Sequence, residues 1–149
     1  MSDERQHAGS SSGHTRARVE AFFRKYQKAF EERDPELIGS CFHAPVCIAT
    51  DTGTAVQTAW FDDAQWLRVI ERLLAQYHAL RVGRVEQRGL EVLEISAHLV
   101  TAAVSWLLFG QRDELLYEFN AVYTLKLEQD GLGILAIAHN EAAAAGRRA

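Results

Sequence analysis

The chain has 149 residues, of which 48% are hydrophobic, with 16 basic and 20 acidic side chains and a net charge of -4. This length suits one domain with a single core, and the acidic balance gives no basic surface of the kind that binds nucleic acid. No apolar run approaches the roughly 18 residues of a membrane span, and the start lacks the apolar stretch of a signal peptide. We therefore expect a cytoplasmic protein with neither a nucleic-acid nor a membrane partner.

Composition divides the chain into one domain and two tails. Residues 1–14 are rich in Ser, Gly, His and charged side chains without apolar periodicity, which predicts a disordered N-terminal tail. Residues 15–141 carry regular patterns and form the predicted domain, and residues 142–149 form a low-complexity C-terminal tail.

Helical patterns fill the first half of this domain. Apolar residues, Tyr26 among them, recur at helical spacing from Thr15 to Arg33. Asp34-Pro35 then predicts the start of a short second helix that ends near Phe42. A third helix begins after Asp62, which with Gln65 three residues later has the pattern of a capping box.

Strand patterns fill the second half. The β-branched segment Pro45–Thr50 predicts a short strand that turns at Asp51-Thr52-Gly53. After Leu80 the period becomes two, and four strands follow, at Arg81–Glu94, His98–Phe109, Leu115–Glu128 and Leu132–Asn140. Helices first and a meander afterwards predict an α+β fold, with three N-terminal helices packed on a bent antiparallel sheet of four to five strands.

Two turns set the expected strand register. If Asp130-Gly131 is a two-residue hairpin loop, the pairs that face the helices are Leu127 with Ile134, Leu125 with Ala136, Tyr123 with Ala138, and Ala121 with Asn140. A preceding turn centred on Gln111-Arg112 pairs Trp106 with Tyr117, Val104 with Phe119, and Ala102 with Ala121. In this register His139 points away from the helices.

The expected inner face combines large aromatic residues with alanines. Such a face either lets the first helix pack closely or encloses a mainly apolar cavity for a small cyclic or aromatic molecule. The residues expected to bind that molecule are Trp60, Trp106, Tyr117, Tyr123 and Asn140. The outer face would carry an apolar patch (Ala103, Leu107, Phe109, Val122, Leu135 and Ile137), which predicts a homodimer through that face.

The order of elements resembles the NTF2-like superfamily, especially its SnoaL-like and ketosteroid isomerase-like members. The resemblance lies in RKYQKAFEERDPELIGSCF, in the strand PVCIAT, and in the closing VYTLKLEQDGLGILAIAHN. It implies a cone-shaped, cystatin-like α+β fold that often encloses a pocket. It also places Tyr26 where ketosteroid isomerases carry an oxyanion-binding Tyr, and Thr50, with Asp51 one step on, where they carry the general base. The position of their second oxyanion acid is Ala121 here.

Three functions remain open from the sequence. The protein binds a small molecule in its pocket, or it is a lyase or isomerase in which Asp51 is the base and Tyr26 stabilises an oxyanion, or it is a structural dimer with a filled interior. Asp51 before Thr52-Gly53 could equally cap a turn, and Tyr26 could be a core tyrosine. No His or Cys cluster has metal-ligand spacing and no phosphate-binding loop is present, so neither a metal nor another cofactor is expected.

Overall fold

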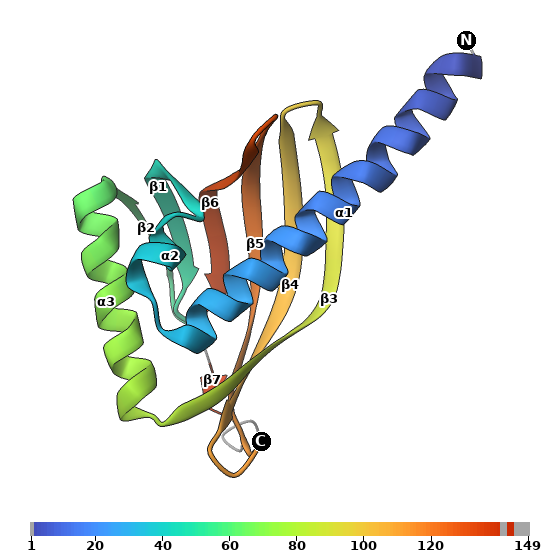
Figure 1. Cartoon of the computed structure of the whole chain (residues 1–149). Coiled ribbons are helices and arrows are strands. Elements are labelled where there is room, and N and C mark those ends of the chain that lie inside the picture. Colours follow the sequence, from blue (N-terminus) through green and yellow to red (C-terminus); the bar gives the residue numbers. More distant parts are fainter. Residues whose placement is uncertain (1, 141–142, 145–149) are drawn as a thin grey trace.

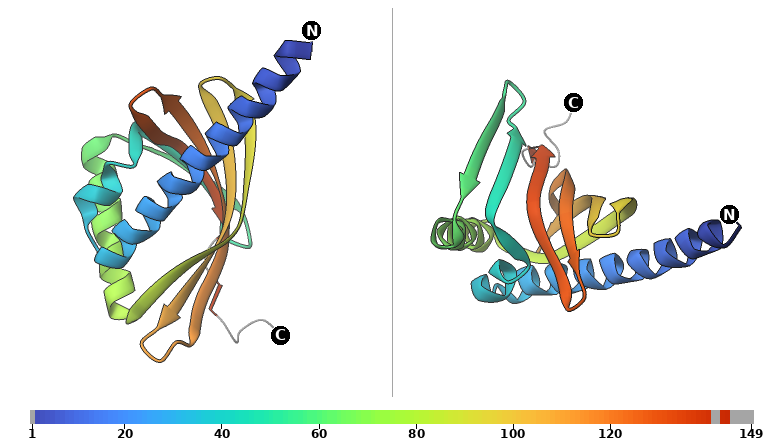
Figure 2. Two further views of the ribbon diagram at one scale, coloured as in Figure 1. Left: turned by 45° about the vertical axis from the view of Figure 1, so that its right-hand side comes forward. Right: turned by 90° about the horizontal axis from the view of Figure 1, so that it is seen from above.

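Helices cover one face of a strongly bent sheet (Figures 1 and 2). The computed structural model describes residues 2–140 and 143–144. Helix α1 (Ser2–Glu32) crosses the sheet diagonally, and α2 (Pro35–Gly39) and α3 (Asp63–Ala79) pack beside its C-terminal end. The helix begins at Ser2, whereas the sequence predicted its start at Thr15, after a disordered tail; its first turns project past the sheet. No helix among the described residues is long and apolar enough to cross a membrane.

Local sequence signals fix where the second and third helices begin. The Asp34 carboxylate accepts a hydrogen bond from the Leu37 amide, and Pro35 occupies the first helical position. At α3 the carboxylate of Asp62 accepts from the Gln65 amide (2.8 Å), while the side chain of Gln65 accepts from the Asp62 amide (2.9 Å). Both predicted helix starts, including the capping box, are confirmed.

In the part of the chain that the structure describes, the sheet has seven strands, in the order β2-β1-β6-β5-β4-β3, with β7 paired to β5. Their bounds are β1 (Phe42–Asp51), β2 (Val56–Phe61), β3 (Val82–Ser96), β4 (Leu99–Gly110), β5 (Leu115–Glu128), β6 (Gly131–Asn140) and β7 (Ala143–Ala144). The four predicted meander strands and the strand after α2 are confirmed, whereas β2 was not predicted. Apart from Ala143–Ala144, the predicted C-terminal tail lies outside the described residues.

Both predicted hairpin registers differ from the observed ones. Trp106 pairs with Phe119 and Ala102 with Tyr123, two residues from the expected partners, so the predicted inner face of β4 and β5 is retained. The β5–β6 turn lies at Gln129-Asp130, since Glu128 pairs with Gly131. Because side chains alternate between faces, a shift of two residues preserves the faces and a shift of one exchanges them.

A β-bulge in β6 exchanges the faces of that strand. Leu125 pairs with Ile134, but Thr124 pairs with Ala136, so the additional residue Leu135 lies in the bulge. Beyond it Tyr123 pairs with Ile137, and Ala121 pairs with His139. The predicted faces of the end of β6 are therefore wrong: the residues facing the helices are Ile137 and His139, while Ala136, Ala138 and Asn140 face outward.

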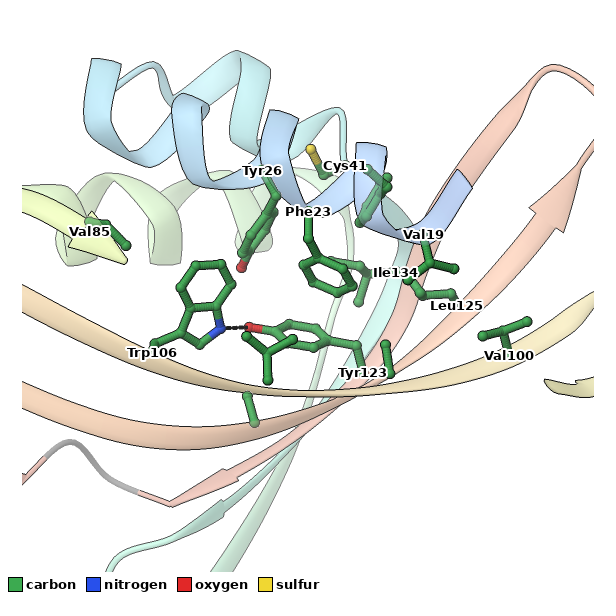
Figure 3. Packing of buried hydrophobic residues seen from close by; sticks show 14 of the residues in the cluster. Val19, Phe23, Tyr26, Cys41, Val85, Val100, Trp106, Tyr123, Leu125 and Ile134 are labelled. Carbon is green, nitrogen blue, oxygen red and sulfur yellow. Dashed lines mark hydrogen bonds between the residues drawn. The ribbon is translucent and has the colours of Figure 1, made fainter. Parts of the chain in front are cut away.

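The main core lies between α1 and the inner face of β4–β6 (Figure 3). Phe23, Leu125 and Ile134 are fully buried there. A second core, which includes Trp66 and Ile70, joins α3 to α2 and β1, and the half-buried Ile137 contacts both cores. These two clusters fix the inner ends of α1 and α3 over the concave face of the sheet.

Candidate functional site

Tyr26, Trp106 and Tyr123 meet at the centre of the main core. The indole N–H of Trp106, on β4, donates a 2.7 Å hydrogen bond to the hydroxyl oxygen of Tyr123, on β5, although the two residues are not register partners: Trp106 pairs with Phe119 and Tyr123 with Ala102. The hydroxyl of Tyr26 points from α1 toward this bond (Figure 3). Its ring lies 5.8 Å from that of Trp106 and 5.9 Å from that of Tyr123. Trp106 and Tyr123 lie on the inner face of the sheet, as the strand pattern predicted, and Tyr26 reaches them from the apolar side of α1.

This cluster contains one more hydrogen-bond donor than its own acceptors use. Trp106 can only donate, whereas each Tyr hydroxyl both donates and accepts. Tyr123 accepts from Trp106, which uses the one hydrogen that the indole offers. Two hydroxyl protons remain, and even when one tyrosine hydroxyl donates to the other, the second proton is left to donate to a further acceptor. The cluster can thus bind a carbonyl oxygen or an oxyanion.

Burial keeps both hydroxyls protonated. Desolvation raises the pKa of Tyr26 well above its ordinary value, and the neighbouring Tyr123 raises it further. Desolvation also raises the pKa of Tyr123, although the hydrogen bond from Trp106 acts in the opposite direction. Burial raises the pKa of Tyr77, which lies near both tyrosines, to about 12. All three are therefore donors at neutral pH.

Stability is expected to fall above about pH 10, the ordinary pKa of tyrosine. Between that pH and about 12, to which burial raises the pKa of Tyr77, the unfolded chain releases protons that the folded chain retains. The contribution of these tyrosines is complete below that window and is lost as pH rises through it. Urea unfolding across this range, together with tyrosinate absorbance, tests this. Ionisation of all four tyrosines near pH 10 with native circular dichroism would contradict it.

His139 and Thr50 form a second polar pair on the inner face. The two residues are partners across β1 and β6, and their Oγ1 and Nε2 atoms lie 3.0 Å apart. The ring of Phe119 packs edge-on against His139 at 6.2 Å. His139 also pairs with Ala121, the small residue at the position where the resemblance to ketosteroid isomerases expects an acid. The expectation that His139 points outward is thus wrong.

The sequence missed His139 because nothing marks the bulge at Leu135 in the amino-acid pattern. The nearest signal is Gly133, where a Cβ atom would lie 3.2 Å from the Cβ atom of His43. That close approach of β1 and β6 precedes the bulge. The pairing of the two strands is irregular there: Phe42 pairs with Ile134, and the next pair is Cys47 with Ala136, so β1 contributes more residues than β6 between the two pairs. Beyond the irregularity, Thr50 and His139 face the interior.

Asp51 and Asn140 lie on the other face of the sheet. They are partners across β1 and β6, one position beyond Thr50 and His139. The exposed carboxylate of Asp51 accepts a 2.8 Å hydrogen bond from the amide of Gly53, whose φ of 94° requires glycine. The side-chain oxygen of Asn140 accepts from the amide of Asn120. Asp51 therefore caps a turn, and neither residue joins Tyr26 on the inner face.

The two other residues predicted to bind a ligand lie in different environments. Trp60 is 68% exposed on β2, at the outer face, so it does not line the interior. Tyr117 is half-buried against the main core, and its backbone pairs with Ala144 of β7. Among the described residues no group of three His, Cys, Asp or Glu side chains could hold a metal.

Two surface grooves lie away from the inner-face cluster. One of about 430 Å³ runs between α1 and β3, lined by Arg16, Glu20, Arg24, Gln87, Arg88, Gly89 and Leu90. The other, of about 200 Å³, lies beside the β5–β6 turn and includes Phe42, His43 and Lys126. None of the residues predicted from sequence to form a site lines either groove.

Comparisons with known proteins identify relatives of this fold. A family model described as NTF2-like protein (DUF6841) matches residues 16–142. A hexachlorocyclohexane dehydrochlorinase from Novosphingobium barchaimii superposes with a TM-score of 0.66 at 10% identity, covering 93% of this chain and 95% of that one. A ketosteroid isomerase-like protein from Erwinia carotovora superposes with a TM-score of 0.61 at 13% identity, covering 83% and 93%. No curated protein sequence matches the chain.

Proposed function

This chain belongs to the NTF2-like family, and on that premise we propose that it binds a small cyclic or aromatic molecule through a carbonyl or other acceptor oxygen. The observation that carries this proposal is the surplus donor of the Tyr26–Tyr123–Trp106 cluster. The inner-face side chains around the cluster are largely aromatic or aliphatic, and they suit a flat apolar ligand body. The dehydrochlorinase with the same fold is named for a cyclic compound.

Matched ligands test the proposal. Acetylnaphthalene and ethylnaphthalene have nearly the same shape, and only the first offers an acceptor oxygen. We expect calorimetric titration to show tighter binding of the ketone, and Tyr123→Phe to weaken it about tenfold, or about 1.4 kcal/mol, without changing ethylnaphthalene binding. Tyr117→Phe, on the same strand and face, is the control and should leave both affinities unchanged. Equal affinities for the two probes in the wild type would refute the acceptor-oxygen proposal.

The second candidate function is enzymatic and rests on His139. A lyase or isomerase needs a base near the group that stabilises the oxyanion. On the inner face, His139 pairs with Ala121, and Tyr123 lies two residues along β5 on the same face, so that His139 and Tyr123 are diagonal neighbours. An imidazole and a tyrosine hydroxyl therefore share this face, as such an enzyme requires. Asp51, the base expected from sequence, is turned to the outer face, so His139 takes that role in this alternative.

We also propose that the outer face of the sheet pairs with a second copy of the chain. One row across that face begins at Trp60 and ends at Leu93, which are 68% and 67% exposed. Between them lie only Cys47, Ala136, Thr124 and Thr101, each the partner of the next. A two-fold axis parallel to the strands would set Trp60 against Leu93 of the partner subunit and close both apolar ends.

A further inference from the structure

A groove of about 430 Å³ separates α1 from β3, the strand at one edge of the sheet. On its helical side Arg16, Glu20 and Arg24 follow one another at intervals of four residues, so they lie on one face of α1. Its other side is lined by the consecutive residues Gln87–Leu90 of β3. Because strand side chains alternate between the two faces of a sheet, such a run indicates that the edge backbone forms part of this wall.

Hydrogen bonds from α1 close the edge of β3 on both sides of the groove. The side chain of Gln27 donates to the carbonyl oxygen of Val85 (2.8 Å), and that of Arg16 donates to the carbonyl oxygen of Leu90 (3.2 Å). Between these contacts β3 has a bulge that includes Gly89, whose φ is 64°. A Cβ atom at Gly89 would meet no atom beyond its chain neighbours within 4 Å, so the groove is open there.

The helical wall of the groove is basic, although the whole chain has a net charge of -4. From Arg16 to Lys28 the only acidic residue of α1 is Glu20, against five basic residues, Arg16, Arg18, Arg24, Lys25 and Lys28. The carboxylate of Glu20 pairs with Arg16, with 3.0 Å between Oε1 and Nε. Arg24 is exposed and takes part in none of the ion pairs that the described residues form. Its guanidinium is therefore available to an anion in the groove.

Arg88, on the β3 side of the groove, already has an acidic partner. Its Nε atom lies 3.2 Å from Oε1 of Glu86, whose other oxygen pairs with Arg84, and Arg84 also pairs with Asp113. These four side chains form a neutral network, and the terminal nitrogens of Arg88 enter none of its ion pairs. Among the described residues that line the groove, the uncompensated charge is thus the positive charge of Arg24, and the one carboxylate, that of Glu20, is paired.

We propose that this groove binds a small organic phosphate, with the phosphate group at Arg24 beside the edge of β3. A phosphate monoester has a charge of about -1.5 to -2 at neutral pH and three acceptor oxygens. It therefore suits a free guanidinium, which can donate two parallel hydrogen bonds to it. The volume of about 430 Å³ lies in the range of small-molecule sites, roughly 300–1,000 Å³. It leaves room for the organic part, to which the half-buried Leu90 offers an apolar contact.

Phosphates and their parent alcohols test this site. Phenyl phosphate and glycerol phosphate, with phenol and glycerol as their counterparts, are titrated against the full chain while the backbone amide resonances are followed by NMR. We expect only the phosphates to shift the resonances of Gln87–Leu90. Arg24→Gln should weaken phosphate binding at least about tenfold, because it removes the free charge. Lys28→Gln is the control: it removes the same charge one turn further along α1, outside the groove, and should leave the affinity within about twofold.

Several results would overturn the proposal. Phosphates that bind no more tightly than their alcohols would exclude a phosphate site. Equal weakening by Arg24→Gln and Lys28→Gln would mean a general attraction to the basic helix, with no role for the groove. Inorganic phosphate that binds as tightly as both esters would exclude recognition of an organic part. The groove lies away from the tyrosine cluster, so Tyr123→Phe should leave phosphate binding unchanged, and this inference and the proposed function can fail separately.

Discussion

Replacing Phe23 by alanine is expected to lower the free energy of unfolding by about 3–5 kcal/mol. The ring is fully buried and contacts the whole cluster, with centroids 5.0 Å from Tyr123, 5.9 Å from Tyr26 and 6.4 Å from Trp106. Removing the ring leaves a cavity that the surroundings cannot close, because β4, β5 and α1 are each held in place by further contacts. Small domains have a total stability of about 5–15 kcal/mol. Urea unfolding followed by circular dichroism should therefore show a much lower midpoint.

Phe109→Ala is the matched control for this loss. Phe109 is only half-buried, and its ring lies 4.0 Å beneath the guanidinium of Arg84. Its removal is expected to cost about 1 kcal/mol, mostly from the lost contact with that cation. Equal losses in the two variants would mean that the main core does not depend on the ring of Phe23, and the packing described between α1 and the sheet would be wrong.

Local signals predicted the elements of this fold well because each depends on a few neighbouring residues. The Asp62–Gln65 capping box and the Asp34-Pro35 helix start act within one turn of chain, and both are observed. The period of two in β4 and β5 placed Trp106, Tyr123 and Ala121 on the inner face. That assignment tolerates the error of two residues in the β4–β5 register, because such an error returns each side chain to the same face.

The end of β6 could not be predicted because its orientation depends on contacts between distant segments. The bulge at Leu135 accompanies an irregularity in β1, the parallel neighbour of β6, which no periodicity in either strand reveals. The predicted register of this segment was wrong by one residue, so it placed Asn140 on the inner face instead of His139. The candidate base His139 was therefore missed. Strand β2 was missed for another reason: it lies at the sheet edge, none of its residues is fully buried, and its burial alternates only over the last three residues.

Val122→Glu is expected to convert a dimer into a monomer and to raise the dimer dissociation constant at least about 100-fold, or about 2.7 kcal/mol. Val122 is 41% exposed on the outer face, between Ala138 and Ala103. A two-fold contact through that face would bury the carboxylate that the substitution introduces against apolar neighbours. Leu80→Glu is the control, since Leu80 is 43% exposed at the end of α3, on the helical side. Sedimentation velocity should show a dimer for the wild type and Leu80→Glu, and a folded monomer for Val122→Glu. A wild-type monomer at micromolar concentration would leave the row from Trp60 to Leu93 without a partner and would refute the proposed dimer.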